Sequence, residues 1–305
     1  MNYYWYRVYG LLVKSEIELT ELITDEPSTP DVEIQYGNVP YKLPHFDDSG
    51  VLFQVTNNDF LFRMEDVGSF RVQNGTLLTI EPDLSPDFSP DLMKVFLMGS
   101  VFGALLHQKG VLVLHASAVS LGDRALVIAG RSSSGKSTLA ASLSNKGYPL
   151  VTDDLSALHA TDSGYFIHPG IPHIKLWKDV IEKMQLEKDL KRIRPKIEKY
   201  RKPSRQSFSD KPLRVLQIIA LESKNSSGIE ILNVKGSPKF ELLHQNTYRY
   251  QFLRGLQKTQ SHFQSVSDLS NRIELFKVRR PSSPLLIDEL ADLVIEKIIR
   301  STDVF

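Results

Sequence analysis

The chain has 305 residues, of which 41% are hydrophobic and 24% are charged. This length favours two domains, and the composition is typical of a soluble globular protein. Its 37 Lys and Arg residues balance 36 Asp and Glu residues, so the net charge of +1 gives no global attraction to nucleic acid or to an anionic membrane. The absence of cysteine excludes disulfides, thiolate metal sites and cysteine nucleophiles.

The same features bear on location and partners. The first ten residues lack the basic and apolar regions of a signal peptide, and the most apolar stretch, Val95–Leu106, is too short to span a bilayer. We therefore expect a cytoplasmic protein, with neither nucleic acid nor a membrane as its main partner. Assembly into a homo-oligomer stays open.

Residues 1–87 are predicted to form an N-terminal, mainly antiparallel β domain. Val32–Tyr36 alternates apolar and polar residues, and Val51–Val55 and Phe60–Arg63 read as a pair of strands around a polar turn. Asn74-Gly75 separates two further runs, as in a hairpin. No catalytic motif occurs in this half of the chain.

Residues 88–305 are predicted to form the second domain. Ser89 followed by Pro90 is the pattern of a helix N-cap with proline at the first helical position, and it opens a predicted helix over Leu92–Gln108. Gly110 closes this helix. We therefore place the domain boundary just before Ser89.

The remaining elements alternate between strands and helices, which predicts an α/β fold. Val111–Ser120 and Ala125–Ala129 form a predicted hairpin, and strands are expected at Leu150–Val151 and around Leu216–Leu221. A helix is expected over Pro238–Leu256. A final helix is predicted because apolar residues recur at spacings of three and four: Leu286, Leu290, Leu293, Val294 and Ile298.

The most informative motif is GRSSSGKST at 130–138, which fits G-x-x-x-x-G-K-[ST]. In such a loop, glycines let successive N–H groups point at phosphate oxygens, and the following helix adds a positive field. Lys136 would neutralise the β- and γ-phosphates of ATP, and Ser137 would ligate Mg²⁺. The plainer interpretation is a Ser/Gly loop that caps an ordinary helix. The predicted nucleotide-binding residues are Gly130, Arg131, Ser132, Ser133, Ser134, Gly135, Lys136, Ser137 and Thr138.

Two adjacent acids, Asp153 and Asp154, follow a predicted buried strand. The interval from Lys136 fits one helix and a return strand, so both carboxylates could reach the loop. Phosphoryl transfer needs one group to hold Mg²⁺ and another to accept the proton of the attacking hydroxyl. His115 could pair with one of these acids. An exposed strand end for the acids and a core position for His115 are the structural alternatives.

The runs LHASAV, GRSSSGKST and GYPLVTDD together resemble the catalytic core of the bacterial HPr kinase/phosphorylase superfamily, and especially its shorter HPr kinase-like members. The resemblance covers roughly Leu92–Trp177. It implies a P-loop kinase domain of the HPr kinase / phosphoenolpyruvate carboxykinase type. It also implies that Asp154 is the general base and that His115 tunes or shares its proton. Asp153 is then the acid that would hold Mg²⁺ with Ser137, although the residues alone leave an exchange of roles between the two acids open.

The chain also departs from that family. HPr kinase/phosphorylases carry a Glu-Arg-Gly stretch after the Asp-Asp strand, which supplies a metal ligand and is associated with dephosphorylation, whereas His168–Trp177 contains no acid. The resemblance therefore does not extend to phosphorolysis or to HPr as the substrate. The shorter group includes kinases for serines of ribosomal peptides, such as lasso-peptide precursors, and kinases for free serine.

A basic run occupies Lys188–Arg205, where only Asp189 and Glu198 oppose nine cations. It is interpreted as a solvated helix face or mobile loop, or else as a surface that docks an acidic segment or contributes cations to the transferring phosphoryl group. Arg249, Arg254, Arg279 and Arg280 are weaker candidates of the same kind, and Trp177 is expected in the core. The cations of the run are Lys188, Lys191, Arg192, Arg194, Lys196, Lys199, Arg201, Lys202 and Arg205.

These residues favour an ATP- and Mg²⁺-dependent kinase that phosphorylates a serine-type hydroxyl of a peptide or small protein. A small-molecule kinase, for example of free serine, would need a closed pocket for the carboxylate and amine. A nucleotide-sensing module without turnover is the third hypothesis. Asp153 and Asp154 beside the loop count against that module, because binding alone needs no base.

Overall fold

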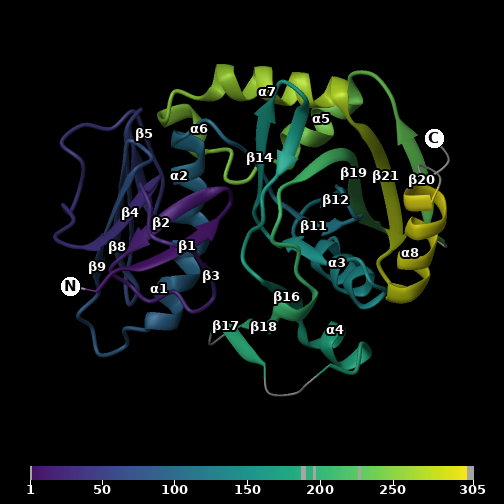
Figure 1. Cartoon of the computed structure of the whole chain (residues 1–305), viewed down its shortest axis with the longest axis horizontal. Helices are drawn as coiled ribbons and strands as arrows, with labels where there is room; N and C mark the ends of the chain where they lie inside the picture. Colours follow the sequence, from purple (N-terminus) through teal and green to yellow (C-terminus); the bar gives the residue numbers. More distant parts are fainter. Residues whose placement is uncertain (1, 187–189, 195–196, 226–227, 301–305) are drawn as a thin grey trace. The chain divides into compact units, whose positions relative to one another are not determined.

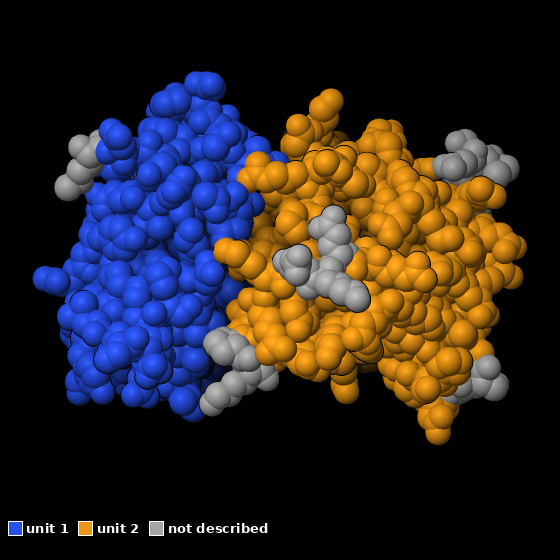
Figure 2. All heavy atoms as spheres, turned by 90° about the horizontal axis from the view of Figure 1, so that it is seen from below, with its two compact units in different colours: residues 1–113, 157–159, 247–265 blue, residues 114–156, 160–246, 266–305 orange. Residues whose placement is uncertain are grey.

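The computed structural model describes residues 2–186, 190–194, 197–225 and 228–300. The chain forms two compact units, which Figure 2 shows in different colours. The first contains residues 1–113, 157–159 and 247–265, and the second contains residues 114–156, 160–246 and 266–305. Both sheet and helix contribute to the fold, which is mixed α/β as predicted. None of the described helices is both long and apolar enough to cross a membrane.

The first unit contains a sheet with the strand order β3-β1-β2-β4-β9-β8-β7-β6-β5 (Figure 1). Neighbouring strands in this sheet are antiparallel, as predicted, except that β4 runs parallel to both β2 and β9. The parallel pairs arise because long connections precede and follow β4 and interrupt the meander. The strands are β1 (Tyr4–Val8), β2 (Leu11–Ser15), β3 (Ile23–Thr24), β4 (Val32–Tyr36), β5 (Asp48–Ser49), β6 (Phe53–Val55), β7 (Asp59–Met64), β8 (Gly68–Gln73) and β9 (Leu77–Pro82).

A helical segment also belongs to this unit: α1 (Pro90–Phe96), the π-helical η1 (Leu97–Val101) and α2 (Phe102–Gln108). Ser89 caps it as predicted, since its hydroxyl accepts a hydrogen bond from the backbone N–H of Leu92. The Gln108 side chain accepts from Gly75 N at 2.6 Å and donates to Val72 O at 3.1 Å. These bonds tie the segment to the β8–β9 hairpin. The helical segment is therefore part of the first compact unit, which continues to Val113.

The single helix expected over Pro238–Leu256 is wrong, because the chain forms two short helices there. α5 (Pro238–Gln245) lies in the second unit, and α6 (Phe252–Gly255) lies in the first. Between them the Asn246 carbonyl accepts a hydrogen bond from His115 N at 2.7 Å, and Arg249 adopts φ of +48°. Both features are incompatible with a continuous helix. Helix α7 (Thr259–Arg272) then passes from the first unit into the second.

The second unit has a mixed sheet whose path includes β15-β19-β12-β11-β13, with β21 beside β19; Figure 1 labels β11, β12, β19 and β21. β12, β19 and β21 are parallel, whereas β11 is antiparallel to both β12 and β13 and forms the predicted hairpin with β12. The residues of β10 (Leu112–Leu114) and β14 (Ser156–Thr161) divide between the units. The other strands are β11 (Ala116–Ser120), β12 (Arg124–Ala129), β13 (Leu150–Thr152), β15 (Gly164–Ile167), β19 (Leu213–Lys224), β20 (Glu230–Val234), which pairs with β21, and β21 (Glu274–Pro281).

Helices α3 (Lys136–Asn145) and α8 (Ile287–Val294), with the π-helical η3 (Ile295–Ile299), pack on this sheet. Apolar side chains of α3 and α8 share one core with those of β12, β19 and β21. The predicted apolar face of the C-terminal helix is buried there at Leu290, Val294 and Ile298. The motif that precedes α3 is thus held in place by a core to which three parallel strands contribute side chains.

A smaller three-stranded sheet, in the order β16-β18-β17, completes the second unit. Most of the basic run lies in it and forms a hairpin, in place of a helix face or a loop. Lys188, Asp189 and Lys196 lie outside the described residues. The elements are β16 (His173–Trp177), α4 (Lys178–Lys183), β17 (Lys191–Arg194), β18 (Ile197–Pro203) and the short 3₁₀ turn η2 (Arg205–Ser207).

Candidate functional site

The G-x-x-x-x-G-K-S segment lies between the end of β12 and the start of α3, so the predicted strand before it and helix after it are both present. Gly130 and Gly135 have φ values of +155° and +105°. A Cβ atom would come within 2.4 Å of Leu221 O at Gly130 and 3.1 Å of the Arg280 guanidinium at Gly135. Only glycine fits both positions, because each combines an unusual backbone conformation with close packing.

The N-terminus of α3 directly follows the second glycine of the motif, Gly135, which is its N-cap residue. No side chain caps this terminus in the described part of the chain. The first N–H groups of a helix lack intrahelical acceptors and carry a partial positive charge. This end of α3 therefore offers donors to an anion.

Lys136 is the first residue of α3, and its side chain is buried. Its Nζ donates to Gly130 O at 2.7 Å and to Arg131 O at 3.0 Å, so the ammonium group closes the loop on itself. Burial lowers the pKa of Lys136 to about 8, although the carboxylates of Asp153 and Asp154 act in the opposite direction. The side chain still carries its charge at neutral pH.

Asp153 is held by three donors. Its Oδ1 accepts from Ser117 Oγ at 2.6 Å and from Ser137 Oγ at 2.8 Å, and its Oδ2 accepts from the backbone N–H of Lys175 at 2.9 Å. The contact with Ser137 brings together the two residues predicted to serve the metal. Ser117 was not predicted, although its spacing of two from His115 in an extended segment was a usable signal.

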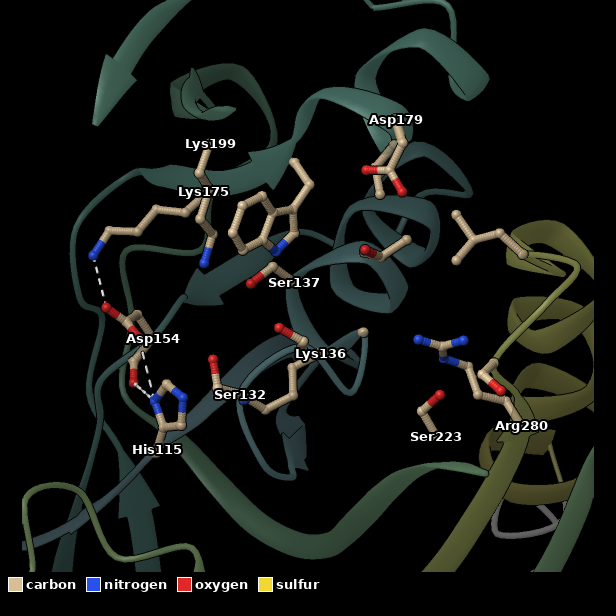
Figure 3. Close-up of a pocket in the computed structure, with 17 residues that line it drawn as sticks. His115, Ser132, Lys136, Ser137, Asp154, Lys175, Asp179, Lys199, Ser223 and Arg280 are labelled. Atoms are coloured by element: carbon tan, nitrogen blue, oxygen red, sulfur yellow. Dashed lines mark hydrogen bonds and ion pairs between the residues drawn. The ribbon is translucent and has the colours of Figure 1, made fainter. Parts of the chain in front are cut away.

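Asp154 lies between two cationic or titratable side chains (Figure 3). Lys175 Nζ is 2.7 Å from Oδ2, and His115 Nδ1 is 3.2 Å from Oδ1 and 2.9 Å from the main-chain oxygen of Asp154. Burial alone would raise the pKa of Asp154, but the Lys175 ammonium and the His115 ring outweigh it and hold that pKa well below its usual value. The carboxyl group is thus ionised at neutral pH, and its side chain is 27% exposed.

Lys136 and Asp154 line the same cavity, which has a volume of about 450 Å³. His115, Asp154 and Lys175 lie at one end of it, Lys136 lies centrally, and Arg280 lies at the other end (Figure 3). Most of the predicted loop lines the same cavity: Ser132, Ser133, Gly135, Lys136, Ser137 and Thr138. Gly130, Arg131 and Ser134 line a neighbouring cavity of similar volume, against β19 and α5. Of the predicted site residues, these three and Asp153 do not line the first cavity, although Asp153 contacts its lining residue Ser137.

Of the four arginines named as weaker candidates, Arg280 reaches the site. Its guanidinium donates to Ser134 O at 2.8 Å and to Pro281 O at 2.7 Å, and burial lowers its pKa without removing its charge. Arg279 instead pairs with Glu222 and Glu230. Arg249 and Arg254 belong to the first unit.

The expected core position of Trp177 is wrong. Its side chain is 40% exposed and lines the cavity. The reason is the alternation of β16, where Ile174 and Leu176 enter the core and the residues between and after them take the other face. Lys199 Nζ lies 5.7 Å from the Trp177 ring centroid, within cation–π range.

Sequence reasoning missed Lys175 and did not single out Lys199 from the basic run. Lys175 lies in the segment His168–Trp177, which drew attention only because it contains no acid. The local pattern indicates a strand there but does not show which of its faces reaches a ligand. Lys199 lies on β18, and the pairing of β18 with β16 places it opposite Trp177. Tertiary pairing, and no local signal, brings both to the cavity.

The donor set suits a hard cation. Among the described residues there is no group of three or more His, Cys, Asp or Glu side chains placed to hold a metal. Mg²⁺ does not need one, since it keeps several waters and is commonly held by one or two protein oxygens together with substrate phosphates. The neighbouring oxygens of Asp153 and Ser137 fit that role.

Comparisons with known proteins give a weak likeness only. No protein-family model matches the chain, and no curated protein matches it in sequence. Among solved structures it is similar to the HPr(Ser) kinase/phosphatase from Coxiella burnetii, with 14% identity and a TM-score of 0.33 over 63% of this chain and 95% of that chain.

Proposed function

We propose that this protein is an ATP- and Mg²⁺-dependent kinase that phosphorylates a serine-type hydroxyl of a peptide or small protein. The observation that carries the proposal is the placement of an ionised carboxylate, Asp154, in the same cavity as Lys136 and Ser137. A cation and a proton acceptor around one cavity are what phosphoryl transfer to an alcohol requires.

The loop and its neighbours would hold the triphosphate. The uncapped N–H groups of α3 and the charges of Lys136 and Arg280 all border the cavity, and together they would offset phosphate charge. Ser137 and Asp153 would hold Mg²⁺, which when bound neutralises charge on the β- and γ-phosphates. Within the described part of the chain, the Lys136 ammonium hydrogen-bonds to two loop carbonyls and to no carboxylate, so no ion pair has to be broken there before it engages a phosphate.

Asp154 would act as the general base. Its carboxylate takes the proton of the acceptor hydroxyl while the acceptor oxygen forms a bond to the γ-phosphorus. The bond from that phosphorus to the bridging oxygen breaks, and its electron pair leaves with ADP. His115 and Lys175 hold the two carboxylate oxygens, so they fix the orientation in which the proton is accepted.

The position of Asp154 also favours catalysis over sensing. A module that only binds a nucleotide has no use for an ionised carboxylate that is oriented by two side chains and remains accessible to a second substrate. Burying such charges costs free energy, which a catalytic role explains.

The test measures ADP formation with saturating ATP and Mg²⁺ and with serine peptides of acidic, neutral and basic sequence or free L-serine as acceptors. Asp154→Asn should lower transfer by at least about 10²-fold, because it removes the proton acceptor, while ATP affinity measured by calorimetry should survive. Asp162→Asn, at an exposed turn, is the matched control. Near wild-type transfer in Asp154→Asn would remove Asp154 as the base, and ATP binding without turnover on any acceptor would favour the sensor.

A further inference from the structure

The register of the small sheet sorts the basic run into two faces. Lys175 pairs with Arg201, Trp177 pairs with Lys199, and Lys191 of the edge strand pairs with Arg201. Side chains of directly paired residues lie on the same side of a sheet. Lys175, Trp177, Lys199, Arg201 and Lys191 therefore share one face, which we call the cationic face.

The opposite face has a different character. Lys202 pairs with Ile174, and Tyr200 pairs with Leu176. Ile174 and Leu176 are buried in the core of the second unit, so this face is the packed one. Arg201 and Lys202 are thus sequence neighbours of equal charge whose side chains leave the strand in opposite directions.

The cationic face is continuous with the candidate site. Lys175, Trp177 and Lys199 line the cavity, and the charge of Lys199 acts on Lys136 within it. In the described part of the chain, Lys199 forms no ion pair with a carboxylate, and its one aromatic contact is with the exposed Trp177. Arg201 lies two residues beyond Lys199 on β18 and pairs with Lys191. These two cations extend the positive charge beyond the residues that line the cavity.

A row of like charges is stabilised when an anion lies against it. The whole chain carries a net charge of only +1, so this concentration of cations is local. Lys199 and Arg201 are two residues apart on β18, and their partners Trp177 and Lys191 lie on the flanking strands about 4.8 Å away. Together these side chains cover the span of a short peptide segment. ATP phosphates are already accounted for by the loop, and the row extends beyond it.

We propose that the cationic face docks acidic residues that flank the acceptor hydroxyl of a polypeptide. The inference rests on the proposed kinase function for its acceptor, but the docking itself needs no transfer. Aspartate or glutamate side chains would pair with Arg201 and Lys199, and the Trp177 ring would pack against the peptide at the mouth of the cavity.

Binding is tested with a fluorescein-labelled peptide in which glutamates flank an alanine that replaces serine, followed by anisotropy at low salt. Arg201→Glu should weaken binding about tenfold, because it turns one attraction into a repulsion. Lys202→Glu, its neighbour on the packed side, should leave the affinity unchanged. Added salt should weaken wild-type binding and reduce the difference between the variants, since exposed charges are screened.

Two further measurements keep the outcome decisive. Arg201→Glu should bind a lysine-flanked peptide better than the wild type does, a gain that a misfolded variant could not show. Equal losses in Arg201→Glu and Lys202→Glu, or equal affinities for glutamate and glutamine peptides, would overturn the proposal. Stronger competition by a DNA oligonucleotide of matched charge would reassign the face to nucleic acid. Because the peptide lacks a serine, docking and the kinase function can fail separately.

Discussion

The two compact units differ in where their buried and partly buried polar groups lie. In the first unit, the buried His107 donates through Nε2 to Tyr248 O at 2.7 Å, and the partly buried Arg71 guanidinium pairs with Asp59 at 2.6 Å. In the second unit, the buried Lys136 and the partly buried Asp154 border a cavity. Polar groups that satisfy one another stabilise a fold, whereas those that face a cavity are available to a ligand.

The difference is also one of charge placement. The pair formed by Arg71 and Asp59 neutralises itself, so this cation has no need of a ligand. Lys136 donates to two loop carbonyls, and Lys199 lies over an aromatic ring. The second unit thus concentrates cations at a place where a phosphate or a carboxylate would neutralise their charge.

The largest effect is expected for Lys136→Ala. The substitution removes the central cation of the cavity, so turnover should fall by about 10³-fold and ATP affinity should drop. Calorimetry and an ADP-release assay measure the two quantities. Lys14→Ala in the first unit, which removes an exposed pair with Glu33, is the control and should change neither. Unchanged ATP affinity and turnover in Lys136→Ala would contradict the assignment of the loop.

The next effect concerns the stability of the first unit. Burial lowers the pKa of His107 to about 4, so the folded unit keeps this ring neutral while the unfolded chain protonates it near pH 6.5. Its contribution to stability is complete above about pH 6.5 and is lost as the pH falls toward 4, by about 3 kcal/mol.

Urea unfolding between pH 7 and pH 4 tests this expectation. His107→Gln retains a donor for the Tyr248 carbonyl but cannot titrate, so its free energy of unfolding should fall less over this interval than that of the wild type. Identical pH dependence in both proteins would show that His107 does not carry the effect. Activity per folded molecule should be the same for both, because His107 belongs to the unit without the cavity.

The smallest effect is expected for Asp153→Asn. An amide is a poorer ligand than a carboxylate for a hard cation, so the Mg²⁺ concentration for half-maximal turnover should rise by about tenfold. Asp59→Asn in the first unit also removes a hydrogen-bonded carboxylate, and it should leave the Mg²⁺ dependence unchanged. A Mg²⁺ titration of ADP formation compares the two. Equal half-saturation in wild type and Asp153→Asn would assign the metal to other oxygens.

Local sequence determined the parts of the site that depend on short-range geometry. The glycines at 130 and 135, with an apolar strand before them and a helix after them, predict the loop, because tight turns and helix starts are set by adjacent residues. The pair Asp153-Asp154 could be placed at the end of a strand for the same reason.

Only the tertiary structure decided which distant residues join them. Lys175 reaches Asp154 across the fold, and the pairing of β16 with β18 places Lys199 opposite Trp177 and sends Arg201 and Lys202 to opposite sides. Pairing of this kind joins segments far apart in sequence, and a shift of one residue would exchange the two faces. The break between α5 and α6 has the same origin, since Asn246 there bonds to His115 instead of continuing a helix. The sequence thus determined the loop and its carboxylates, and long-range strand pairing decided the side chains that surround them.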